Sequence, residues 1–237
     1  MANKNSTHGH FLAILLLFAG FSLYAISSFF GSTNDYIDNM YVSVVDEGMV
    51  ALDMSEEVGL FTDVLTGHLN AEAIGTLYDA GIVGGYDDGS FRPDNTINRA
   101  ELLTVVTNAV DADFSGMALG NCFTDVHDEW FAVFICYAKD RGWVKGYNDG
   151  SYGPGRTISK AEAIKIVMEA FNVAECLPVT QKPYEDVEVD AWFAPYACAA
   201  KRDGLVASAG LFNADRNITR AEFVQVVYNL MVSRGYF

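Results

Sequence analysis

Apolar residues along this chain recur with the spacing of an amphipathic helix in six segments. In three of them the apolar positions follow an i, i+3, i+4, i+7 pattern, which places them on one face of a helix. These faces are Leu102, Val105, Val106 and Ala109; Ala163, Ile166, Val167 and Ala170; and Phe223, Val226, Val227 and Leu230. A shorter apolar face precedes each: Ala73, Ile74 and Leu77; Phe131, Phe134, Ile135 and Ala138; and Phe193, Ala197 and Ala200. The pattern predicts an all-α protein built from paired helices.

The helix pairs belong to a unit of roughly 60 residues that occurs three times. Each copy opens with an aromatic-x-Asp-Val turn, which begins at Phe61, Phe123 and Tyr184. A glycine follows each first helix, as a left-handed cap requires; these are Gly81, Gly142 and Gly204. None of the helices buries its apolar face alone. We therefore predict three helix-loop-helix repeats, residues 61–110, 123–172 and 184–231, packed about a pseudo-threefold axis.

The loop between the two helices differs among the copies. In the first two it reads Gly-Tyr-x-Asp-Gly-Ser-aromatic, from Gly85 and from Gly146, whereas the third copy is two residues shorter and lacks Tyr-x-Asp-Gly. The two glycines either let a ligand approach the backbone or simply form the turn. An aromatic residue in register in all three copies is predicted to fill the core: Phe91, Tyr152 and Phe212.

A capping-box motif marks the start of each second helix. Its members are Asn98 and Glu101, Ser159 and Glu162, and Thr219 and Glu222. The first side chain accepts from a backbone amide of the helix, and the glutamate reaches back to the amide of the cap residue. This gives the recurrent glutamates a structural role in place of a catalytic one.

The residue after each cap is basic: Arg99, Lys160 and Arg220. The amides and dipole at a helix N-terminus already make the field positive, so a cation there is unfavourable by up to about 1 kcal/mol. Two interpretations are open. The helix amides and the cation together hold an anion, or each cation pairs with a neighbouring carboxylate.

The composition limits the partners and the chemistry. With 15 basic and 31 acidic residues, the formal net charge is −16, which argues against binding a nucleic-acid backbone or an anionic membrane surface. Counting from Asp87, the twelfth residue is Asn98 and not the Glu of an EF-hand loop, so calcium binding is disfavoured. The histidines form no recurring set, and no nucleophile motif is present. We expect no catalytic residues, no metal and no cofactor.

The N-terminus predicts export. Lys4 precedes an uncharged stretch from Phe11 to Phe30, close to the roughly 20 residues of a membrane-spanning helix. We interpret residues 1–31 as a hydrophobic helix that is either a signal anchor with the N-terminus inside or a signal peptide cleaved near Ala25-Ile26-Ser27. Residues 32–60 form an acidic linker, and everything after Gly31 faces outward.

The four cysteines occur only in repeats two and three. Cys136 and Cys198 hold equivalent positions, and each has one cysteine shortly upstream, Cys122 and Cys176. The pattern favours the disulfides Cys122–Cys136 and Cys176–Cys198, and export agrees with them. Free buried thiols and a four-thiolate zinc site are the alternatives, although no Cys-x-x-Cys pair is present.

Together these motifs resemble the S-layer homology (SLH) domain, in three copies from about Phe61 to Met231. The likeness rests on the aromatic-x-Asp-Val turn, the tryptophans Trp130 and Trp192, the Gly-Tyr-x-Asp-Gly-Ser loop and the Ile-Thr-Arg-Ala-Glu ending. It implies a helical trefoil on a bacterial cell surface that attaches non-covalently to cell-wall polysaccharide, often an acidic, ketal-pyruvylated polymer, in grooves between repeats. Protein–protein assembly within the envelope is the alternative role.

Carried onto this chain, the resemblance assigns ligand contacts to Arg99, Lys160, Arg220, Trp130 and Trp192, with Gly85 and Gly146 beside them. Core packing is the alternative for the tryptophans. The copies depart from the family at Leu69, where a tryptophan is usual, and at Lys160, where an arginine is usual, so we expect the grooves to bind unequally. We also expect alanine at the three basic positions to weaken wall binding and to leave thermal stability nearly unchanged.

Overall fold

The computed structural model describes residues 59–117 and 120–237 of the chain. These ranges contain six helices and no β-strand: α1 (Ala71–Asp79), α2 (Arg99–Ala109), α3 (Ala132–Asp140), α4 (Lys160–Ala170), α5 (Ala194–Arg202) and α6 (Arg220–Ser233). The all-α class is as predicted. In the described part, no helix has the length and apolar character needed to cross a bilayer. The predicted N-terminal hydrophobic helix and nearly all of the acidic linker lie outside these ranges and stay predictions.

The helix ends follow the local sequence signals. All three capping boxes form, with the cap side chain accepting from the backbone amide of the glutamate and the glutamate accepting from the cap amide. The first helices end two residues before a left-handed glycine, with φ of 70° at Gly81, 78° at Gly142 and 69° at Gly204. Positive φ values of this kind are costly for residues with a Cβ. The predicted starts of the second helices and ends of the first helices are therefore confirmed.

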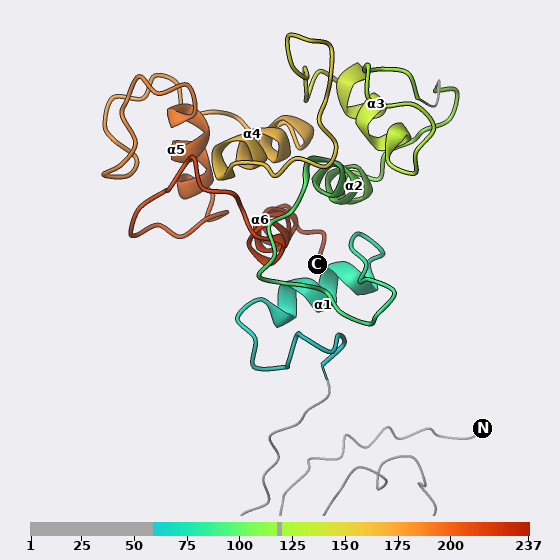
Figure 1. The fold of residues 1–237 in the computed structure, drawn as a ribbon. Helices are drawn as coiled ribbons and strands as arrows, with labels where there is room; N and C mark the ends of the chain where they lie inside the picture. Colours follow the sequence, from blue (N-terminus) through green and yellow to red (C-terminus); the bar gives the residue numbers. More distant parts are fainter. Residues whose placement is uncertain (1–58, 118–119) are drawn as a thin grey trace, which may run out of the picture. The chain divides into compact units, whose positions relative to one another are not determined.

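The second helices of the three repeats form the centre of the fold, and each of them packs against the first helix of another repeat. Helices α2, α4 and α6 contact one another, whereas α3 packs on α2, α5 packs on α4, and α1 packs on α6 (Figure 1). Each second helix thus receives the first helix of the following repeat, and the series closes when repeat three receives α1. Because the partner of each helix comes from another repeat, the three copies form one interdependent core.

Backbone hydrogen bonds join the segments that lead into the second helices. The Ile97 amide donates to the Ile218 carbonyl and the Ile218 amide donates to the Ile158 carbonyl, both at 3.2 Å. All three isoleucine side chains have no exposed surface. The apolar stripes predicted for the second helices are buried as well, so the core of the described residues lies where these three segments and helices meet.

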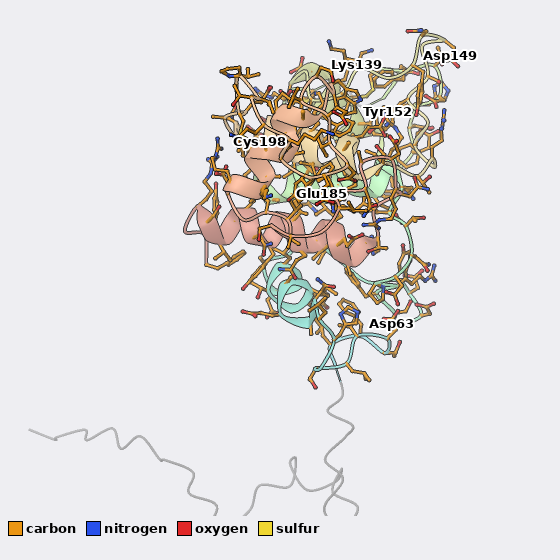
Figure 2. All side chains as sticks on the ribbon, turned by 90° about the vertical axis from the view of Figure 1, so that its left-hand side faces the viewer. Asp63, Lys139, Asp149, Tyr152, Glu185 and Cys198 are labelled. Carbon is orange, nitrogen blue, oxygen red and sulfur yellow. A yellow bond between two sulfur atoms is a disulfide. The ribbon has the colours of Figure 1, made fainter. Side chains whose placement is uncertain are left out.

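An aspartate in each opening turn ties that turn to the far end of the loop. The two carboxylate oxygens of Asp63 accept from the amides of Phe91 and Arg92, each at 2.7 Å. Asp125 and Asp186 accept from the equivalent amides at 2.7 to 2.9 Å. Figure 2 shows Asp63 on its turn, close to where the described chain begins. These bonds hold the predicted core aromatics in place, and each is at most 1% exposed: Phe91, Tyr152 and Phe212.

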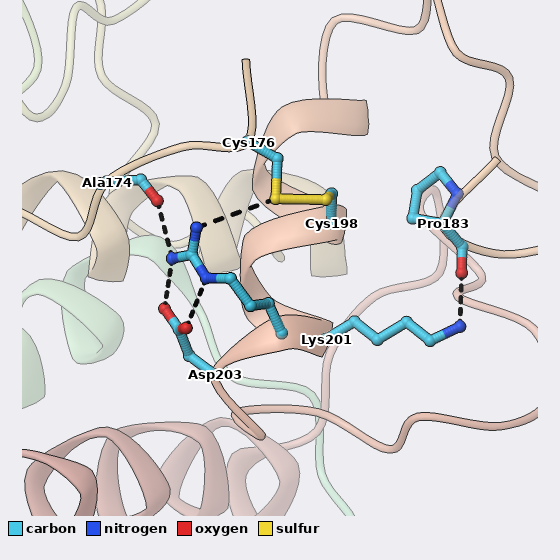
Figure 3. The surroundings of a disulfide bond; sticks show 7 residues. Ala174, Cys176, Pro183, Cys198, Lys201 and Asp203 are labelled. Atoms are coloured by element: carbon cyan, nitrogen blue, oxygen red, sulfur yellow. Dashed lines mark hydrogen bonds and ion pairs between the residues drawn. A yellow bond between two sulfur atoms is a disulfide. The ribbon is translucent and has the colours of Figure 1, made fainter. Parts of the chain in front are cut away.

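The cysteines come together in the two pairs favoured by the sequence. Cys122 and Cys136 are at disulfide distance with their Cα atoms 5.5 Å apart, and Cys176 and Cys198 with theirs 5.9 Å apart. Each pair fastens the segment before a repeat to the first helix of that repeat, as Figure 3 shows for Cys198 on α5. A single four-thiolate zinc site needs all four sulfurs together, so that alternative does not apply.

Candidate functional site

The three basic residues all reach into the loop of the following repeat. Arg220, from repeat three, lies against the first loop; Arg99, from repeat one, lies against the second; and Lys160, from repeat two, lies beside Phe212 in the third. Each cation therefore sits at a boundary between repeats, which was predicted for ligand grooves of this family. The three are not held alike.

Arg220 is clamped by backbone carbonyls. Its Nε donates to Phe91 O at 3.0 Å and its Nη2 donates to Gly84 O at 2.7 Å. The guanidinium also lies 4.7 Å from the ring centroid of Phe91 and 5.1 Å from that of Tyr86. Carbonyl dipoles and ring faces both favour a cation, which allows this side chain to be only 7% exposed.

Arg99 repeats part of this arrangement in the second loop. Its Nε donates to Tyr152 O at 3.0 Å, and its guanidinium lies 4.3 Å from the Tyr152 ring and 5.3 Å from the Tyr147 ring. It is also only 7% exposed. No hydrogen bond from its two terminal nitrogens is present among the described residues, so both keep free N–H donors.

The interpretation in which helix amides help to hold an anion is wrong. In α6 the amides of Arg220 and Ala221 donate to the carbonyls of Asn95 and Pro93 at 2.8 and 3.0 Å. The equivalent bonds, between 2.8 and 3.1 Å, join Arg99 to Arg156, Ala100 to Pro154, Lys160 to Arg216 and Ala161 to Ala214. The capping side chains take the third amide of each helix. The helix N-termini are used to join neighbouring repeats, and only the side chains remain for a ligand.

The alternative in which each cation pairs with a carboxylate is also wrong for the part of the chain described here. Its five ion pairs join other residues: Arg92 and Asp88, Lys165 and Glu169, Lys182 and Glu188, Arg202 and Asp203, and Arg216 and Glu222. The buried guanidinium groups of Arg99 and Arg220 thus line surface depressions and form no ion pair within the described residues.

The first depression, here called the Arg220 groove, has a volume of about 410 Å³. One wall is the loop that follows α1, Gly81 to Tyr86; the other is formed by the α2 residues Glu101, Thr104, Val105 and Asn108. Arg220 and Trp130 complete it. All three repeats therefore contribute to one groove, and two of the predicted ligand residues lie in it together.

The second depression, here called the Arg99 groove, has a volume of about 320 Å³ and the same plan one repeat further on. Its lining comprises the loop residues Trp143 to Tyr147, the α4 residues Glu162, Lys165 and Ile166, and Arg99 and Trp192. Trp192 occupies the place that Trp130 has in the first groove.

Both groove tryptophans are exposed and not part of the core. Trp130 is 63% exposed and Trp192 is 55% exposed. Each forms a T-shaped pair with the phenylalanine that follows it, with ring centroids 5.4 Å apart, and more than half of its surface stays exposed. A large exposed apolar ring beside a buried cation is suited to a sugar, because the face of the indole packs on C–H groups while its N–H donates.

The two loop glycines have an internal reason to lack a side chain. A Cβ on Gly85 would lie 2.4 Å from the Phe61 ring, and one on Gly146 would lie 2.5 Å from the Phe123 ring. The opening aromatic of each repeat thus fills the space. Both glycines still line their grooves, but the turn interpretation explains them without a ligand.

The third position is built differently. Lys160 is half-buried, with its Nζ 5.1 Å from the centroid of Phe212, and burial lowers the pKa of its ammonium group. Leu69 replaces the groove tryptophan and is 92% exposed. The carbonyl of Ala207, equivalent to the Gly84 carbonyl bound by Arg220, accepts from the Tyr184 hydroxyl at 2.6 Å.

Two groups of residues escaped the sequence analysis. Tyr86 lines the Arg220 groove, and its hydroxyl donates to Glu101 at 2.9 Å; burial and this bond raise the pKa of the phenol against the opposing field of Arg220. Lys145, Lys165 and Trp143 line the Arg99 groove. Tyr86 lies in a recurring motif that could have marked it, whereas the other three positions do not recur and gave no signal.

Comparisons with known proteins match the repeated part of the chain. A family model described as S-layer homology domain matches residues 60–103, 123–164 and 183–224, together more than half of the chain. The Surface-layer 125 kDa protein of Lysinibacillus sphaericus is 30% identical over 162 residues, 65% of this chain and 13% of that protein. The Cellulosome-anchoring protein of Acetivibrio thermocellus is 28% identical over 135 residues, 56% of this chain and 30% of that protein. S-layer protein sap of Bacillus anthracis is 25% identical over 171 residues, 70% and 20% respectively. The chain spans less than a third of the length of each of these relatives.

Proposed function

Because this chain belongs to the S-layer homology domain family, we infer that it is a non-catalytic protein of the bacterial cell envelope that attaches to the cell wall outside the cytoplasm. Its ligand is an anionic, pyruvylated cell-wall polysaccharide, held non-covalently in the Arg220 groove and the Arg99 groove. The printed names of its relatives, surface-layer and cellulosome-anchoring proteins, support a role at the cell surface.

The observation that carries this proposal is a buried guanidinium in the lining of each groove that forms no ion pair within the described residues. Burying a cation is costly unless it is paired, and carbonyls and ring faces compensate for that cost only in part. An acidic sugar that enters the groove adds the missing negative charge, and the exposed indole beside it packs on the ring of the sugar. The cation and the aromatic surface together select an acidic glycan over a neutral glycan or a free anion.

Binding of the full chain to purified wall sacculi tests the proposal. We expect binding to sacculi, and loss of binding after the secondary polysaccharide is extracted. If the protein binds extracted sacculi equally well, the ligand is a protein or the peptidoglycan itself, and the polysaccharide proposal fails.

Two variants with a matched control connect the binding to the grooves. Trp130→Ala and Trp192→Ala each remove an exposed aromatic face, and we expect binding weaker by about tenfold or more, the scale for truncating an aromatic at the centre of an interface. Leu69→Ala changes the equivalent exposed position of repeat one, which lies in neither of these two grooves, and should leave binding unchanged. Equal losses in all three variants would contradict a role for the two grooves.

A further inference from the structure

The two grooves are built from equivalent elements but carry different charges. The Arg99 groove is lined by the cations Arg99, Lys145 and Lys165 and one carboxylate, Glu162. The Arg220 groove is lined by one cation, Arg220, and one carboxylate, Glu101. Counted over these lining residues alone, without Glu169, the ion-pair partner of Lys165, their formal charges are +2 and zero. In a chain with about twice as many acidic as basic residues, three cations in one groove form a local exception.

The extra charge comes from two defined replacements. Lys145 lies three residues after the glycine that ends α3, where Gly84 lies after the glycine that ends α1. Lys165 lies five residues beyond the start of α4, where Thr104 lies five residues beyond the start of α2. The two lysines thus flank the groove from opposite walls, one on the loop and one on the helix.

Both lysines keep donors for a ligand. Lys145 is exposed and forms no ion pair in the described ranges. The Nζ of Lys165 lies 3.2 Å from Glu169 Oε1, an oxygen that also accepts from the Tyr196 hydroxyl at 3.0 Å. An ammonium group has three donors, so the shared contact with Glu169 leaves two. This pair orients Lys165 along α4 without saturating it.

The glutamate in each groove is already occupied by its helix cap. Glu162 accepts from the Ser159 amide at 3.3 Å, and Glu101 accepts from the Asn98 amide at 3.1 Å. The carboxylates therefore contribute about equally to both grooves and do not account for the difference. The Arg99 groove also has Trp143 where the Arg220 groove has Ile82, which adds a second indole.

We propose that the Arg99 groove selects a polysaccharide segment that carries two negative charges, whereas the Arg220 groove accepts a singly charged sugar. Lys145 and Lys165 determine this specificity by contacting the second charge, while Arg99 contacts the first. The inference rests on the proposed function, since it assigns the charge of the ligand to each groove of that same site.

The tryptophans allow each groove to be observed separately. The chain has three, and all line these grooves: Trp130 in the Arg220 groove, and Trp143 and Trp192 in the Arg99 groove. Fluorine NMR of the full chain, labelled with fluorotryptophan and solubilised in neutral detergent, gives one signal per residue once single Trp→Phe variants assign them. The probes are a sugar with one pyruvate ketal and the same sugar carrying a methyl phosphodiester as well, so that they bear one and two negative charges.

In the wild-type protein, we expect the doubly charged probe to shift the Trp143 and Trp192 signals at about tenfold lower concentration than the singly charged probe, the scale for two partly exposed ion pairs. The Trp130 signal should respond to both probes at similar concentrations. Lys145→Gln with Lys165→Gln should remove the preference of the Arg99 groove and leave the response of Trp130 unchanged.

The reciprocal variant transfers the preference. Gly84→Lys with Thr104→Lys places the two cations in the Arg220 groove, and a Cβ at Gly84 meets no atom within 4 Å. We expect Trp130 to acquire the preference for the doubly charged probe. Equal responses of both grooves to both probes would overturn this inference and leave the proposed function standing. No response of any tryptophan to either probe, in a protein that retains its fold, would count against both.

Discussion

Arg220 and Lys160 occupy equivalent positions at the start of α6 and α4, yet the protein uses them differently. Arg220 donates two hydrogen bonds to carbonyls of the first loop and is nearly buried. The Lys160 side chain lies over the Phe212 ring and forms no hydrogen bond within the described residues, and the Tyr184 hydroxyl donates to the Ala207 carbonyl, the counterpart of the Gly84 carbonyl that Arg220 binds. The arginine joins two repeats as well as facing a groove, whereas the lysine does not join them.

Under the proposed function the arginine has two roles, joining two repeats and contacting the ligand. A guanidinium has five donors in a fixed plane, so it can bind loop carbonyls on one side and still present N–H groups on the other. An ammonium group is a point charge and cannot span both. A lysine can therefore replace the arginine at this position without loss of the fold where another residue donates a hydrogen bond to the loop carbonyl, as Tyr184 does for Ala207.

The largest expected effect is on stability. Arg220→Ala leaves two loop carbonyls without their donor and opens a space beside Phe91, so we expect the free energy of unfolding to fall by about 3 kcal/mol. Lys160→Ala should cost less than about 1 kcal/mol, because it breaks no hydrogen bond. Chemical denaturation of the two variants measures both. From the sequence alone, a cation at a helix N-terminus is mildly unfavourable, which predicted little loss of stability in either variant. Similar small losses in both variants would support that prediction and contradict the structural role of the Arg220 hydrogen bonds.

A double-mutant cycle tests which side chain, Tyr184 or an arginine at position 160, donates to the Ala207 carbonyl. Tyr184→Phe removes the hydroxyl that donates to the Ala207 carbonyl, and repeats one and two already have phenylalanine there. We expect Lys160→Arg to be nearly neutral alone but to stabilise the Tyr184→Phe protein by about 1 kcal/mol, the net value of one hydrogen bond. Additive effects of the two changes would show that the arginine does not reach this carbonyl.

The smallest effect is a pH dependence confined to Lys160. Burial lowers the pKa of the Lys160 ammonium group in the folded state below its ordinary value of 10.5. At neutral pH the folded protein therefore bears the cost of burying this charge. Stability rises as the pH increases toward 10.5, because the folded state loses the proton before the unfolded state does. The melting temperature of the wild type, compared with that of Lys160→Met, should therefore rise over this range. The same comparison with Arg220→Met should stay flat, because arginine remains charged. A flat Lys160 comparison would contradict the burial of its charge.

Most of the fold was predictable because local signals repeat. The capping pairs Asn98 and Glu101, Ser159 and Glu162, and Thr219 and Glu222 fixed the starts of three helices, and the left-handed glycines fixed the ends of the other three. The disulfide pairs followed from equivalent cysteine positions. Each inference needs only residues near one another in the chain, and the periodicity of the apolar positions supplied the buried faces.

The site was predictable only in its composition. Arg99, Arg220, Trp130 and Trp192 do line grooves. One of the two interpretations open from the sequence gave the ligand helix amides that in fact bind carbonyls of the next repeat. The sequence also offered no reason to expect Lys145 and Lys165 in one groove, since they lie on different elements and neither recurs. Contacts between repeats depend on the order in which helices pack, and no local pattern records that order.

The sequence by itself determined the helices, their ends, the buried faces and the repeated placement of a cation beside each cap, because these depend on hydrogen bonds and periodicity within a few turns. Only the tertiary structure decided that α1 packs on α6 and that each cation faces the loop of another repeat. That choice depends on three apolar faces being buried at once, which is a property of the closed ring of repeats and not of any one copy.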